Sequence, residues 1–135
     1  MVRSGRKPRL CVVGDETFLW SVRHEHHVDD AAPPVSRYQD CREILTLRRR
    51  ATQGRLQIVF RRGAGRLVPD GYLPSGAVGT SDGVWLNLHE PGTVRALLDE
   101  AITRGWTAGE AVTTHIDGWE LFDAVAERRT RTTST

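Results

Sequence analysis

One segment of the chain has the spacing of an amphipathic helix. Apolar side chains recur every three or four residues after Pro91, and they are Val94, Leu97, Leu98, Ala101 and Ile102. This spacing gathers them on one helical face, and proline is well suited to the first helical position. Gly105 supplies a stop at the carboxyl end. A helix with one apolar face has to pack against another layer, so we expect a layered fold.

Several other segments alternate apolar and polar residues, as half-buried strands do. The clearest apolar positions are Phe18, Trp20 and Val22 in one segment and Leu56, Ile58 and Phe60 in another. Shorter patterns predict strands at residues 10–13, 44–47 and 84–88. Residues 116–122 predict a last strand in which Trp119 and Leu121 face inward. Because most strands follow one another directly, we expect an α+β fold: an antiparallel sheet of about five to six strands with one amphipathic helix packed on one face.

Length and composition predict one soluble domain. The chain has 135 residues, of which 39% are hydrophobic and 27% charged, and no apolar run approaches the roughly 18 residues that span a membrane. We expect a single domain at residues 9–126, a flexible basic tail at 1–8 and a flexible tail at 127–135. No secretion signal is recognisable, which predicts a cytoplasmic location, no membrane partner and reduced thiols at Cys11 and Cys41.

Two segments of the chain show no regular spacing of apolar residues. Residues 28–40 are rich in Asp and Pro and predict a connecting loop, and residues 63–83 are rich in Gly and Pro. We expect an ordered loop in the second segment, with room for a short strand around Ala77 and Val78.

Arginine is by far the commonest basic residue. The chain has eighteen Arg, one Lys and a single Asn, a bias that indicates a high-GC bacterial genome. The basic residues are also concentrated, because residues 1–66 hold 14 basic and 7 acidic side chains whereas residues 67–135 hold 5 and 10. Their density is greatest on the hairpin predicted around residues 44–60. The candidate binding side chains there are Arg48, Arg50, Arg55, Arg61 and Arg62.

The arginine-rich hairpin predicts a non-catalytic binding or accessory module. A two-stranded ribbon can follow a phosphate backbone, and complementary charged patches also steer proteins together. The partner is therefore a protein or a nucleic acid. Self-association is a further alternative, because the basic hairpin of one copy could face the acidic second half of another. We expect no cofactor for this function.

The run His24-Glu25-His26-His27 predicts an alternative function as a small metal-binding protein or enzyme. In a strand, His24 and His26 lie on one face and could hold one divalent metal. The pair resembles the HxH element of cupin metal sites, although Asp29 or Asp30 would have to replace the glutamate of that pattern. The sequence does not locate the remaining ligands.

Catalytic residue types are present without an organising motif. Ser75, His89 and Asp117 have the chemistry of a nucleophile, a base and an orienting group, but no G-x-S-x-G sequence occurs. This favours a non-catalytic protein. Trp85 and Trp106 flank the predicted helix, and we expect any ligand pocket beside them.

Overall fold

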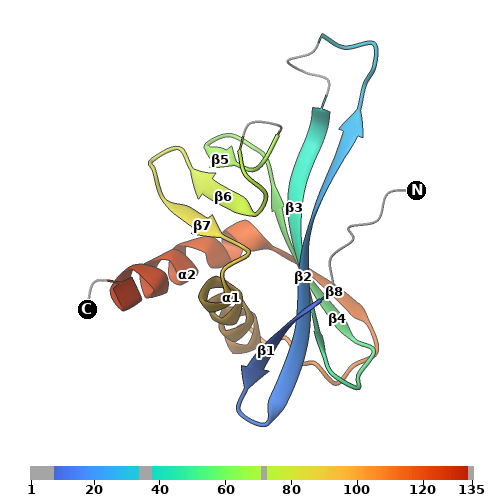
Figure 1. The fold of residues 1–135 in the computed structure, drawn as a ribbon, viewed down its shortest axis with the longest axis vertical. Helices are drawn as coiled ribbons and strands as arrows, with labels where there is room; N and C mark the ends of the chain where they lie inside the picture. Colours follow the sequence, from blue (N-terminus) through green and yellow to red (C-terminus); the bar gives the residue numbers. More distant parts are fainter. Residues whose placement is uncertain (1–7, 34–37, 71–72, 134–135) are drawn as a thin grey trace.

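The computed structural model describes residues 8–33, 38–70 and 73–133, which fold as an α+β structure with two sheets and two helices (Figure 1). In chain order the elements are β1 (Arg9–Val13), β2 (Glu16–Val28), β3 (Tyr38–Arg49), β4 (Arg55–Arg61), β5 (Arg66–Leu67), β6 (Ala77–Thr80), β7 (Trp85–Asn87), α1 (Pro91–Thr103), β8 (Thr113–Asp117) and α2 (Gly118–Thr133). Neither helix is long and apolar enough to cross a membrane.

The larger sheet has the strand order β1-β2-β3-β4-β8. The first four strands pair antiparallel, whereas β8 pairs with β4 in parallel, from Arg55 opposite Thr113 to Val59 opposite Asp117. The prediction of a wholly antiparallel sheet is therefore wrong at this edge. The cause is the long connection between β4 and β8, because it contains the second sheet and α1 and returns the chain in the original direction.

A second sheet has the order β5-β6-β7. Residues 77–80, inside the segment expected to be an ordered loop with a short strand, form β6 and pair with both neighbours. The strand predicted at residues 84–88 exists as β7, but it joins this small sheet instead of the main one. A short turn joins β6 to β7, and Gly83 takes a φ of +93° in it.

The core lies on the face of the main sheet that α1 and α2 cover. The alternation predicted for β2 is confirmed, because Phe18, Trp20 and Val22 are all buried. The predicted helix is confirmed as α1, with Val94, Leu97, Leu98 and Ala101 buried. Ile102 departs from the prediction, since it is 43% exposed.

The C-terminal segment forms a second helix, so the predictions of a last strand at residues 116–122 and of only one helix are wrong. The strand ends at Asp117, whose Oδ1 accepts a hydrogen bond from the Trp119 backbone N–H at 3.0 Å. Such a bond satisfies a free donor of the first helical turn. Helix α2 then buries Leu121, Phe122 and Val125, and it continues through residues 127–133, part of the segment for which the sequence predicts a flexible tail.

One glycine permits this arrangement. A Cβ at Gly118 would lie 2.5 Å from the Phe60 ring, so only glycine lets α2 begin this close to β4.

The two faces of the main sheet have different surroundings. Figure 1 shows both helices and the small sheet on one side of it. On the opposite side, which we call the outer face, no described helix or strand covers the sheet. Many outward-facing side chains reach solvent there, including Arg55, Arg61 and His115, although the cross-strand pair Ile44 and Val59 is buried.

Candidate functional site

The outer face has a polar row that crosses four strands. The register places Ser21 beside Thr46, Thr46 beside Gln57 and Gln57 beside His115. All four point away from the helices, because the residues before and after them in each strand face the core. Hydroxyl, amide and imidazole groups of this kind can donate hydrogen bonds to an anion.

Two of the five predicted binding arginines, Arg48 and Arg55, lie next to this row, and a third, Arg50, lies in the adjoining turn. Arg48 and Arg55 continue the β3–β4 register beyond Leu47 and Leu56, so they are cross-strand neighbours on the outer face. Arg50 lies in the turn between the strands, where its backbone N–H donates to the Thr17 carbonyl at 2.7 Å. The structure thus brings Arg48, Arg50 and Arg55 together at one end of the sheet.

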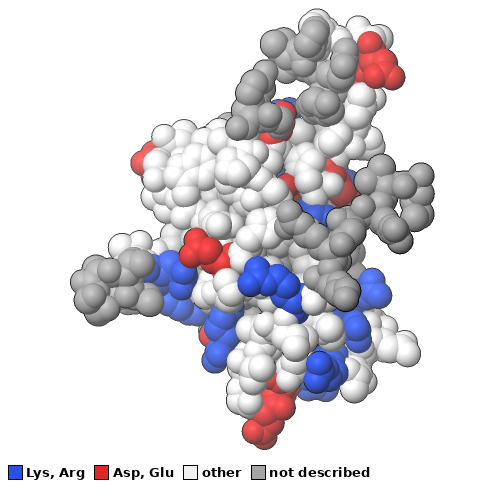
Figure 2. Space-filling model, viewed as in Figure 1, with Lys and Arg blue, Asp and Glu red and all other residues white. Residues whose placement is uncertain are grey.

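The charge of this arginine group is not neutralised inside the described chain. Arg48 donates to the backbone carbonyl of Thr52 at 3.0 Å, which leaves its positive charge uncompensated. No ion pair to Arg50 or Arg55 occurs among the described residues. In Figure 2, most of the visible Lys and Arg atoms lie in the lower half, both near the turns of the main sheet and beside the carboxyl end of α2.

The other two predicted arginines lie elsewhere. Arg61 is on the same face but six residues along β4 from Arg55, about 20 Å away at the usual rise of a strand. Arg62 follows the end of β4, and its guanidinium lies 3.6 Å from the Asp70 carboxylate. The five residues therefore form no single cluster.

Near Arg61, charged side chains of the outer face pair with one another. The Glu25 carboxylate accepts hydrogen bonds from Arg23 at 2.8 Å and from Arg42 at 2.7 Å. The bond from Arg23 lowers the pKa of Glu25 below its usual range. An external anion would compete with these bonds here, but not beside Arg48 and Arg55.

The predicted histidine pair lies on the inner face, beside a cavity of about 420 Å³. The rings of His24 and His26 are neighbours, with centroids 5.0 Å apart. Nδ1 of His24 is already engaged, because it lies 2.6 Å from Oε1 of Glu43. Within the described chain, no group of three or more His, Cys, Asp or Glu side chains is arranged to hold a metal ion.

Glu43 is the site residue that the sequence analysis missed. It is fully buried, and its Oε2 accepts the Gly76 backbone N–H at 2.9 Å. Burial raises the pKa of its carboxyl group, although the bonds from His24 and Gly76 act in the opposite direction. A signal was present, because Glu43 occupies an inward position of β3 between Cys41 and Leu45, where an unpaired carboxylate would be costly.

Ser75 and His89 are in contact, as their residue types suggested. Ser75 Oγ lies 3.0 Å from His89 Nε2, but Asp117 is on β8 and caps α2 instead of orienting the histidine. The backbone N–H groups after Ser75 are also occupied, because Gly76 donates to Glu43 and Ala77 donates to the Pro74 carbonyl. The pair therefore lacks the nearby backbone donors that acyl transfer requires.

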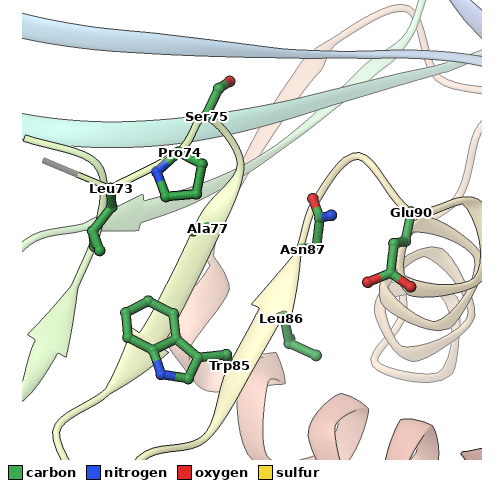
Figure 3. A pocket seen from close by; sticks show the side chains of 8 residues that line it. All are labelled: Leu73, Pro74, Ser75, Ala77, Trp85, Leu86, Asn87 and Glu90. Atoms are coloured by element: carbon green, nitrogen blue, oxygen red, sulfur yellow. The ribbon is translucent and has the colours of Figure 1, made fainter. Parts of the chain in front are cut away.

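Of the two tryptophans expected to flank a pocket, Trp85 lines one in the described chain. It is 44% exposed and lines a cavity of about 400 Å³ whose other side chains come from the segment before β6, from β6 and β7, and from the β7–α1 connection (Figure 3). They are Leu73, Pro74, Ser75, Ala77, Leu86, Asn87 and Glu90. Trp106 is 9% exposed and packs against Phe18 in the core, with ring centroids 6.2 Å apart.

Comparison with protein-family models, with curated proteins and with solved structures gives no match for this chain. The function is therefore inferred from the geometry and charge of its own residues.

Proposed function

We propose that the chain is a binding module that contacts the phosphate backbone of a nucleic acid through the outer face of its main sheet. The observation that supports this function most directly is the group formed by Arg48, Arg50 and Arg55, which has no carboxylate partner in the described chain. Guanidinium groups bind phosphate oxygens with charge-assisted hydrogen bonds, and their affinity comes from the release of counterions.

The neighbouring polar row favours a nucleic acid over a protein. Ser, Thr and Gln side chains supply many of the phosphate contacts in known complexes, and Ser21, Thr46 and Gln57 lie directly beside the arginine group. Neither the polar row nor the arginine group contains a Phe, Tyr or Trp side chain that could stack on a base. We therefore expect binding through the backbone, with little dependence on sequence.

Fluorescence anisotropy tests the proposal. A labelled DNA duplex and a labelled single strand are titrated with the protein between about 50 and 200 mM salt. We expect binding that weakens as salt rises. In the double variant Arg48→Gln/Arg55→Gln, the slope of log affinity against log salt should fall by about 2, because each arginine accounts for roughly one phosphate.

A matched control separates a local contact from net charge. The variant Arg95→Gln/Arg104→Gln also removes two positive charges, but Arg95 lies on α1, Arg104 directly follows it, and both pair with carboxylates of that helix. It should keep most of the affinity and the slope. Equal losses in the two double variants, or no binding at about 50 mM salt, would contradict the proposal and favour a protein partner at this face.

A further inference from the structure

The described residues that line the cavity beside His24 include two carboxylates, two imidazoles, a hydroxyl and two apolar side chains. It lies between the inner face of β2 and β3 and the segment that precedes β6. Its lining residues are His24, His26, Glu43, Pro69, Asp70, Leu73 and Ser75. Two of them are carboxylates and none is Arg or Lys. The lining therefore disfavours an anion and favours a group with positive charge.

Glu43 determines which way His24 presents its nitrogens. The carboxylate is buried and uses both oxygens, Oε1 toward His24 Nδ1 at 2.6 Å and Oε2 toward the Gly76 N–H at 2.9 Å. In a neutral His24 whose Nδ1 donates to this carboxylate, Nε2 has the lone pair and is the acceptor that His24 offers to the cavity.

Two further acceptors come from the segment before β6. Ser75 Oγ lies 3.0 Å from His89 Nε2, and a hydroxyl that donates its proton to this nitrogen keeps its lone pairs for another donor. The Asp70 carboxylate lies 3.6 Å from the Arg62 guanidinium, beyond the length of a strong hydrogen bond. His24, Ser75 and Asp70 thus give the cavity three acceptor side chains of different types.

We infer that this cavity binds the ammonium group of a small primary amine. An ammonium has three N–H donors and no acceptor, which complements the acceptor side chains of His24, Ser75 and Asp70. Pro69 and Leu73 supply apolar surface for the hydrocarbon part of the ligand. A volume of about 420 Å³ is within the range of small-molecule sites. The inference is independent of the proposed nucleic-acid contact, which uses the opposite face of the sheet.

Three probes of the same shape test the charge preference. Cyclohexylamine, cyclohexanol and cyclohexanecarboxylate are titrated into the protein at neutral pH, and the histidine ring signals are followed by NMR. We expect saturable shifts of His24 and His26 with the amine, weaker shifts with the alcohol and none with the carboxylate. His115, on the outer face, should stay unmoved. Equal responses to all three probes, or no saturable response to the amine, would overturn the inference.

Variants at two acceptors test the site itself. Asp70 and Ser75 lie at the rim of the core, so Asp70→Asn and Ser75→Ala should fold even if changes at buried Glu43 do not. Each should weaken cyclohexylamine binding about tenfold, the usual effect of losing a hydrogen bond to a charged group. Asp99→Asn makes the same charge change on α1 and should bind as the wild type does. Unchanged affinity in both cavity variants would show that the amine binds elsewhere.

Discussion

Glu43 on β3 and His24 on β2 face each other across the strand pair, with Glu43 Oε1 2.6 Å from His24 Nδ1. The second oxygen of Glu43 accepts the Gly76 N–H from the segment before β6. One buried carboxylate therefore links the main sheet, the predicted histidine site and the small sheet.

This link predicts an unusual pH dependence of stability. Burial raises the pKa of Glu43 in the folded chain, so the folded state keeps a proton at pH values where the unfolded state has lost it. The contribution of Glu43 to the free energy of unfolding is then greatest below the ordinary glutamate pKa and declines as pH rises through the folded-state value. In urea denaturation, Glu43→Gln should therefore gain stability relative to the wild type as pH rises from about 4.

Glu25 is a matched comparison with the opposite sign. Its pKa is lowered by the hydrogen bond from Arg23, so its contribution to stability is present above the ordinary glutamate pKa and is lost as pH falls through the lowered value. The Glu25→Gln variant should accordingly lose stability relative to the wild type as pH rises. Parallel pH profiles for the two variants would contradict this assignment.

The Pro74-Ser75-Gly76 turn depends on the missing side chain of Gly76. This residue has a φ of +83°, and a Cβ there would lie 2.5 Å from Cδ2 of the His89 ring. Gly83 also has a positive φ, +93°, but a Cβ would meet nothing within 4 Å. Both alanine variants incur the backbone cost, about 1–2 kcal/mol. Gly76→Ala should lose at least about 1 kcal/mol more, because the His89 ring must also move. Equal losses in urea denaturation would show that the ring accommodates the methyl group freely.

Glu100 joins the two helices. Its carboxylate accepts hydrogen bonds from Arg104, just after α1, at 2.9 Å and from Arg128 of α2 at 3.0 Å, and the residue is 8% exposed. Replacing it by alanine leaves two guanidinium groups without this partner, so we expect Glu100→Ala to lower the free energy of unfolding by about 1–3 kcal/mol. The adjacent Asp99 pairs with Arg95 alone on the exposed side of α1, and Asp99→Ala should cost less than about 0.5 kcal/mol. Thermal and urea unfolding of the two variants provide the comparison.

Features with a local cause could be predicted from the sequence. The spacing of apolar residues within one segment predicts which side chains of β2 face the core and where α1 lies. Both predictions are confirmed. The parallel pairing of β4 with β8 was not predictable in this way, because a long connection separates Arg55 from Thr113 and no turn sets the register.

The candidate sites show the same limit. The sequence placed His24 and His26 on one face, but it did not reveal the contact of His24 with Glu43. That contact depends on the β2–β3 register, which shifts between Glu25 and His27 and is set across a long loop. The arginine hairpin was recognised as a unit, yet only the structure separates Arg48 and Arg55 from Arg61.

In the segment after Asp117, the alternation of Trp119 and Leu121 with polar Glu120 predicts a strand, whereas the structure has the helix α2. The two forms place Phe122 differently, which can be tested. A strand that buries Trp119 and Leu121 would point Phe122 outward, whereas α2 buries Phe122 at 2% exposure. We therefore expect Phe122→Ala to lower the free energy of unfolding by about 3–5 kcal/mol in urea denaturation. The exposed neighbour Asp123 is the control, and Asp123→Ala should change stability by no more than about 0.5 kcal/mol. A small effect at Phe122 would contradict the helix, because a side chain that faces solvent leaves no cavity when it is removed.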